Sequence, residues 1–207
     1  MGNRSVLTAA FRAESIFRKD TQVDGEGEKP DRYPLSLRIL HWIRALLILA
    51  MIPLGWYMVS LADTVPVKFA TLYPLHKEFG VLTFLVATTQ LVIRSRTKLP
   101  APPVGLARWE VILSRAVQIG ILVLVVLVPL MGYAMSSTFT QSDGVPFFFT
   151  ELPELLPKND RAFAVFQLLH RTFAYTLLAL VMLHVLGALK HRFFDRGGET
   201  DVLSRML

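Results

Sequence analysis

The sequence predicts an all-α fold, an integral membrane four-helix bundle, from its composition and from the length of its apolar stretches. Of the 207 residues 53% are hydrophobic, and the mean hydropathy is +0.46, which is too apolar for an ordinary soluble domain. Four apolar stretches lie near residues 39–61, 76–94, 112–137 and 165–189. Each is about as long as a helix that crosses a hydrocarbon core of roughly 30 Å. The second stretch is the least apolar.

The remaining segments predict how the chain is organised around these helices. Residues 1–32 are polar, lack the apolar segment of a signal peptide, and are expected to form a flexible tail. Residues 33–207 then form a single membrane domain. Residues 99–105 (LPAPPVG) predict a short stiff linker. The longer connection, residues 136–160, contains FFF, and we expect a partly ordered cap with a short amphipathic helix on the membrane surface.

The basic residues predict which side of the membrane each connection faces. All but five of the 22 Lys and Arg lie in the N-terminal tail, the 94–110 connection, the C-terminal tail or the adjoining helix ends; the exceptions are Lys68, Lys77, Lys158, Arg161 and Arg171. Because cytoplasmic loops are enriched in Lys and Arg, both termini are expected in the cytoplasm and the Phe-rich connection outside. The same distribution favours membrane orientation over a nucleic-acid-binding patch, so we expect no nucleic-acid partner.

Four histidines fall at two depths of the predicted bundle. His41 opens the first stretch at the cytoplasmic side, whereas His76 opens the second at the outer side. His170 and His184 both lie on the fourth stretch, about 21 Å apart along a helix and within ~40° of the same direction. The spacing therefore predicts two pairs, His41 with His184 at the inner level and His76 with His170 at the outer level.

The chemistry of such pairs limits which metal or cofactor they can bind. A lone His on an apolar helix is usually a satisfied core or interfacial residue, but four in two matched levels are not explained that way. Zinc and copper sites need three or four ligands, and a proton relay would need interspersed Asp and Glu. The absence of cysteine excludes thiolate sites and covalent c-type haem. Two opposed imidazoles suit a six-coordinate b-type haem, so the sequence predicts two non-covalent haems.

Further candidate residues lie beside these histidines. Lys77 and Arg171, next to the outer ligands, either snorkel to the interface or neutralise haem propionates and draw in anions. Arg38 and Arg44 present the same alternatives at the inner level. His191 lies two turns beyond the inner histidine of the fourth stretch. It is either an ordinary interfacial basic residue or a hydrogen-bonding partner of a quinone near the inner haem.

Several stretches together resemble the bacterial cytochrome b561 family over about residues 33–207. They are RILHWIRALLILAMIPLGWYM, PLHKEFGVLTFLVATTQLVIRSR, LMGYAMSS, LLHRTFAYTLLALVMLHVLGALKHRFFDR and the ending DVLSRML. The resemblance implies four helices in a bacterial inner membrane and two b haems. It also implies axial ligands that match His41, His76, His170 and His184.

The resemblance and the ligand set together predict electron transfer, because an iron with both axial positions filled does not activate dioxygen. Similar family members oxidise superoxide outside and reduce ubiquinone in the membrane, and a rim of Lys77, Arg171 and Lys158 would steer the anion to the outer haem. The alternative is an electron-transfer or anchor subunit for a separate periplasmic dehydrogenase or other redox partner, docked on the Phe-rich connection. A small transporter is disfavoured because broken-helix repeats are missing.

Overall fold

The structure, a computed structural model, describes residues 32–103, 105–142, 144–195 and 200–207. The expected flexible tail, apart from residue 32, lies outside these residues. In chain order the elements are helix α2 (Leu35–Ser60), the π-helix η1 (Lys68–Leu72), helices α3 (Tyr73–Ser95) and α4 (Arg108–Thr138), strands β1 (Val145–Phe147) and β2 (Thr150–Leu152), and helix α5 (Asp160–Phe193). The four long helices agree with the four apolar stretches, and each extends beyond the predicted bounds at one end or both.

Three of the helices, α2, α4 and α5, are long and apolar enough to cross a membrane. Helix α3 has 23 residues, enough for a crossing, but its mean hydropathy is lowered by polar residues such as Thr83, Thr88 and Gln90. Two of these threonine hydroxyls donate to backbone carbonyls one turn earlier, at Phe79 and Phe84, which satisfies them inside an apolar helix. That α3 also crosses the membrane remains a prediction.

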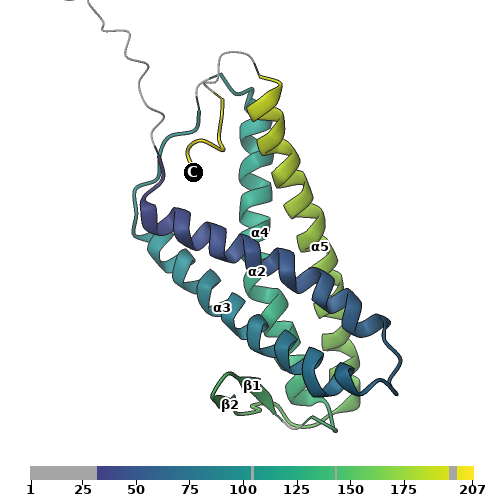
Figure 1. The fold of residues 1–207 in the computed structure, drawn as a ribbon. Helices are drawn as coiled ribbons and strands as arrows, with labels where there is room; N and C mark the ends of the chain where they lie inside the picture. Colours follow the sequence, from purple (N-terminus) through teal and green to yellow (C-terminus); the bar gives the residue numbers. More distant parts are fainter. Residues whose placement is uncertain (1–31, 104, 143, 196–199) are drawn as a thin grey trace, which may run out of the picture. The chain divides into compact units, whose positions relative to one another are not determined.

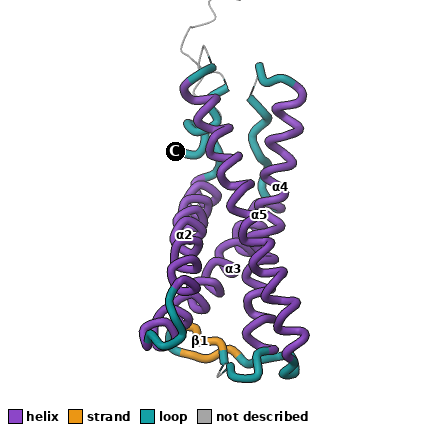
Figure 2. The backbone as a smooth tube through the Cα atoms, turned by 90° about the vertical axis from the view of Figure 1, so that its right-hand side faces the viewer, coloured by secondary structure: helices purple, strands orange, loops and turns teal. Residues whose placement is uncertain are grey.

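The helices pack in sequence order. Helix α2 packs against α3, α3 against α4, and α4 against α5, which is the most extensive contact. Figure 1 shows the α2–α3 pair inclined to the α4–α5 pair, and Figure 2 shows α4 and α5 side by side from another direction. Helix α5 begins after Asn159, whose side-chain oxygen accepts a hydrogen bond from the backbone N–H of Ala162 at 3.0 Å.

The connection between α4 and α5 contains a β-hairpin, where an amphipathic helix was expected. Strands β1 and β2 pair antiparallel, with Val145 opposite Leu152, and are coloured orange in Figure 2. Phe148 at the turn has φ +51°, a left-handed conformation that a helix does not use. Pro146 and Pro153 also disfavour a helix, because proline lacks the N–H of the helical ladder, and the phenylalanines favour a strand. The predicted amphipathic helix is therefore wrong.

A buried aliphatic layer lies midway along the bundle, and we call it the middle layer. Its members are Ile48 on α2, Ala87 on α3, Val117, Ile121 and Val125 on α4, and Leu177 on α5. Thr83 on α3 is also buried. Ile48, Thr83 and Leu177 each lie seven residues, about two helical turns, from a predicted ligand on the same helix. The middle layer therefore separates the two levels at which the histidines lie.

Candidate functional site

The structure brings the four histidine rings together in two pairs. His76 on α3 faces His170 on α5, with ring centroids 6.1 Å apart and planes at 79°. His41 on α2 faces His184 on α5, with centroids 6.3 Å apart and planes at 63°. The first pair lies on the side of the β-hairpin and is called the hairpin-side pair. The second lies on the side of the α3–α4 connection and is called the linker-side pair.

Both ring separations fit one metal ion ligated by two imidazoles. A metal–imidazole bond is about 2.0–2.1 Å long and the ligating nitrogen lies about 1.1 Å from its ring centroid, so an ion between two rings holds their centroids about 6.2 Å apart. The observed 6.1 and 6.3 Å match this value. Among the described residues no group of three or more His, Asp or Glu side chains could hold a metal ion. The donor set thus suits an ion whose other ligands come from a macrocycle.

The hairpin-side pair has one ring fixed by the backbone. The ring nitrogen Nδ1 of His170 lies 2.9 Å from the carbonyl oxygen of Val128 on α4. Because a carbonyl only accepts, Nδ1 carries the proton, and Nε2 is left with a lone pair for a metal. On the other ring, Nδ1 of His76 is buried without a hydrogen-bond partner among the described residues. Among the described glycines, Gly132 and Gly55 are the two at which an added Cβ would meet one of these rings.

The linker-side pair lies near buried cationic and polar side chains. Arg44, about one helical turn after His41 on α2, is only 7% exposed. Nη1 of Arg44, Nε of Arg38 and Oε1 of Gln90 are buried without partners among the described residues. A buried guanidinium without an anion is costly, so the two arginine nitrogens favour a negatively charged group at this level, whereas the Gln90 oxygen needs a hydrogen-bond donor. The carboxylates of a haem have that charge.

Trp42 connects the linker-side pair to the last described residues. Its ring meets the ring of His41 edge to face, with centroids 5.4 Å apart, and its indole N–H donates to the carbonyl of Met206 at 2.9 Å. The backbone N–H of Tyr33 also donates to the carbonyl of Arg205, at 3.1 Å. Residues 205–206 therefore pack against the start of α2.

His191 belongs to an ionic cluster at the end of α5. Its Nδ1 lies 2.6 Å from Oδ2 of Asp195, and Lys190 forms ion pairs with Asp195 at 3.2 Å and with Glu110 at 2.6 Å. The hydrogen bonds from His191, then from Thr200 and Lys190, lower the pKa of Asp195 to about 2. Asp195 is therefore ionised at any physiological pH, and it orients the His191 ring with Nε2 left for another partner.

The basic residues expected to form an outer rim lie in two different settings. Lys77 donates to the carbonyl of Gly144 at 2.9 Å, and Lys158 donates to the carbonyl of Ser142 at 3.3 Å and pairs with Glu154. Both lysines thus contact backbone carbonyls of the segment that precedes β1. Arg171 is exposed. The two lysines help to hold the hairpin in place, a role that the sequence analysis did not assign to them.

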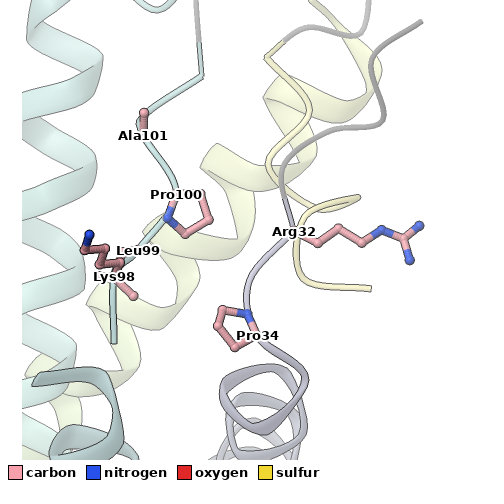
Figure 3. Close-up of a pocket in the computed structure, with 6 residues that line it drawn as sticks. All are labelled: Arg32, Pro34, Lys98, Leu99, Pro100 and Ala101. Carbon is pink, nitrogen blue, oxygen red and sulfur yellow. The ribbon is translucent and has the colours of Figure 1, made fainter. Parts of the chain in front are cut away.

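Figure 3 shows a pocket that holds none of the predicted ligands. It is lined by Arg32, Pro34, Lys98, Leu99, Pro100 and Ala101. The Arg32 side chain points away from the side of the pocket formed by Lys98. The two cations therefore do not converge on a common point, and the pocket is not part of the histidine sites.

Three residues near the rings were missed by the sequence analysis, although a signal for them is present. Gly55 lies fourteen residues after His41, and Gln90 lies fourteen after His76, which repeats the spacing of the two histidines on α5. Gly132 lies seven residues after Val125 of the middle layer. Extending the fourteen-residue spacing to every helix would have placed Gly55 at the hairpin-side level and Gln90 at the linker-side level.

Comparisons with known proteins agree with this arrangement. The family model for prokaryotic cytochrome b561 matches residues 32–207. The chain is also similar to cytochrome b561 homolog 2 of Escherichia coli (strain K12), with 26% identity over 181 residues, which cover 86% of this chain and 92% of that protein. The chain therefore belongs to the prokaryotic cytochrome b561 family, membrane proteins that bind b-type haem and transfer electrons.

Proposed function

We propose that the protein holds two b-type haems, one at each histidine pair, and carries electrons from superoxide on the hairpin side to ubiquinone on the linker side. The observation that carries this proposal is the presence of two ring pairs, at 6.1 and 6.3 Å, on opposite sides of the middle layer. When bound, each haem supplies a one-electron carrier. In this proposal His76 and His170 ligate one iron, and His41 and His184 ligate the other.

The basic residues support an anionic donor on the hairpin side. Lys77 and Arg171 directly follow the two hairpin-side histidines in sequence, and Lys158 lies on the same connection as the hairpin. A positive rim raises the encounter rate of a small anion such as superoxide, and the gain decreases as ionic strength rises. Because the Lys77 ammonium keeps its charge while it donates to Gly144, one side chain serves both the rim and the hairpin.

The linker side has groups suited to a quinone and to the haem carboxylates. Arg38 and Arg44 have buried guanidinium atoms without partners among the described residues, and would pair with the haem carboxylates. His191, oriented by Asp195, would donate a hydrogen bond or a proton to ubiquinone through Nε2. This assignment uses the one His ring of the chain that does not belong to either pair.

The distribution of Lys and Arg supports an orientation for the whole chain. Seventeen of the 22, all but the five named for the outer side, lie toward the termini or the α3–α4 connection. In a bacterial inner membrane this distribution supports a topology with both termini and the linker-side pair toward the cytoplasm, and the hairpin toward the periplasm.

The hairpin favours a second candidate function, an electron-transfer or anchor subunit for a separate periplasmic redox protein. Phe149 at its turn is fully exposed and Phe148 is 48% exposed, while Leu155 nearby is 75% exposed. Exposed aromatic side chains are typical anchors of protein interfaces. In this case the donor is a protein docked on the hairpin, and small anions have no special access.

Stopped-flow reduction of the haems by superoxide, measured against ionic strength, tests the proposal. We expect wild-type reduction that competes with spontaneous dismutation at low salt. Replacing Arg171 by Gln should slow it about two- to fivefold at low salt and little at high salt, because one steering charge is lost. Lys77→Gln should have a larger effect than Lys77→Arg, which keeps the charge.

A matched charge change provides the control. Arg161, at the start of α5 and also exposed, lies more than two turns before His170, so Arg161→Gln should change the rate much less than Arg171→Gln. A wild-type rate too slow to compete with dismutation would rule out superoxide as the donor. The docked-subunit function would then be the better proposal, provided that the spectrum still shows b-type haem.

A further inference from the structure

On the hairpin side, two helices present histidine and two present glycine. His76 comes from α3 and His170 from α5, while Gly55 comes from α2 and Gly132 from α4. The described glycines differ in what a side chain would meet. Among the described residues, no glycine is one at which an added Cβ would meet His41 or His184 within 4 Å. A Cβ on Gly187, three residues after His184, would meet nothing within 4 Å.

At Gly132 and Gly55 a histidine ring lies against the space that a Cβ would fill, and we call this space a notch. The notch at Gly132 is the tighter of the two. A Cβ at this residue would lie 3.1 Å from both Cε1 and Nδ1 of His170, closer than carbon atoms normally pack. The ring would have to move by a few tenths of an ångström. The same ring donates from Nδ1 to the carbonyl of Val128, one turn earlier on α4, at 2.9 Å. The ring is therefore fixed by a notch and a carbonyl of one helix.

Gly55 forms a looser notch for the opposite ring. A Cβ there would lie 3.4 Å from Cε1 and 3.9 Å from Nδ1 of His76, which is close to ordinary van der Waals contact. Elsewhere on α3, a Cβ on Gly80 would lie 3.8 Å from Cε of Met51, also an ordinary contact. A side chain at Gly132 would therefore lie closest to a histidine ring, and one at Gly55 less close. Side chains at Gly80 and Gly187 would meet no histidine ring within 4 Å.

We propose that Gly132 is a positioning residue for His170: its missing side chain lets the ring reach the Val128 carbonyl and sets the ring plane. Gly55 has the same role for His76 with a smaller effect. This inference rests on the proposed haem ligation. A hydrogen bond from Nδ1 to a backbone carbonyl makes an imidazole a stronger donor to its metal, which stabilises ferric iron. Disturbing the notch should therefore raise the reduction potential of the hairpin-side haem alone.

The test compares single glycine variants of the full-length protein, purified with its haems. Redox titration and low-temperature electron paramagnetic resonance resolve the two low-spin haems. Gly132→Ala should shift the signal and raise the midpoint potential of the haem that is lost in His170→Ala, and leave the other unchanged. Gly55→Ala should give a smaller shift of the same haem. Gly187→Ala, the matched control on α5, should shift neither.

A serine at the same residue separates size from hydrogen bonding. A helical serine often donates to the carbonyl four residues earlier, and for residue 132 that carbonyl belongs to Val128. Gly132→Ser would thus compete for the acceptor of His170 as well as fill the notch. The upward potential shift should therefore exceed that of Gly132→Ala. Equal shifts would show that the carbonyl has no part in positioning the ring and would overturn that half of the proposal.

A double-mutant cycle covers the case in which Gly132→Ala loses its haem or its stability. If the notch exists for the ring, Gly132→Ala should lower the thermal midpoint of the wild type but have almost no effect in a His170→Ala background. An equal loss in both backgrounds, or equal potential shifts of both haems, would overturn the proposal. A wild type without two b-type signals would instead refute the proposed di-haem function, so the two failures are distinguishable.

Discussion

The two histidine pairs consist of the same side chains and have nearly the same ring separation, but their surroundings differ. The hairpin-side pair meets glycine notches and a backbone carbonyl, whereas the linker-side pair lies near the buried Arg44 guanidinium and the Gln90 amide. A buried positive charge favours the iron state that holds one more electron. The surroundings, and not the histidines, therefore distinguish the two levels. With the proposed haems bound, they would favour electron flow from the hairpin side to the linker side.

Replacing a single histidine of either pair should have the largest effect on the difference between the two levels. His184→Ala and His41→Ala should each lose the linker-side haem and keep the other, because each leaves one imidazole where two are needed. His76→Ala and His170→Ala should lose the hairpin-side haem. Pyridine haemochrome assays should give about one haem per chain in each case. A pattern in which His41→Ala matches His76→Ala would contradict the pairing.

Removing a charge near one level should change the reduction potential at that level alone. Arg44→Gln should lower the midpoint potential of the linker-side haem by tens of millivolts, on the scale of one unit charge at an effective dielectric constant of about 20. The other haem should not change. Arg44→Lys keeps the charge and is the matched control. Equal shifts of both haems in a redox titration would show that Arg44 acts through the fold and not through its field.

The smallest expected effect concerns the quinone side. The pKa of Asp195 is lowered to about 2, chiefly by the hydrogen bond from His191. A lowered carboxyl pKa means that the ionised group stabilises the fold above its usual pKa of about 3.9, and that this contribution is lost as the pH falls toward 2. Between pH 5 and 8 Asp195 therefore stays ionised, and its own titration changes nothing.

Asp195→Asn then tests what the fixed charge does for His191. Without the carboxylate, the His191 ring loses the acceptor that orients it, so haem oxidation by a soluble ubiquinone analogue should slow by less than about threefold. Thr200→Val, which removes only the hydroxyl donor to Asp195, is the control and should have a smaller effect. An unchanged oxidation rate would remove Asp195 from the proposed quinone site.

Much of this arrangement could be predicted from the sequence because it depends on helical spacing. Fourteen residues between His170 and His184 bring both rings to one face, and the apolar stretches determine the depth of each. The notch at Gly132 could not be found in this way. It depends on how closely α4 approaches α5, which is a property of packing between helices and not of either helix alone.

The hairpin shows a second limit of the sequence analysis. The apolar and acidic residues of the α4–α5 connection are compatible with an amphipathic helix, but prolines and the turn at Phe148 produce two short strands. The roles of Lys77 and Lys158 follow from this turn, because the carbonyls that they bind belong to the connection itself. Charge counting assigned both lysines to the outer side, which stays a prediction, and it did not predict these contacts.

The middle layer has an energetic consequence for turnover. Its aliphatic side chains offer no path for a proton, and the Thr83 hydroxyl already donates to a backbone carbonyl. In the proposed function, an electron that passes from one level to the other would therefore cross without a proton and move net negative charge through the membrane. With the proposed orientation, an inside-negative membrane potential opposes this step by up to about 2.3 kcal/mol per 100 mV. The rate of such a protein would thus respond to the energised state of the cell.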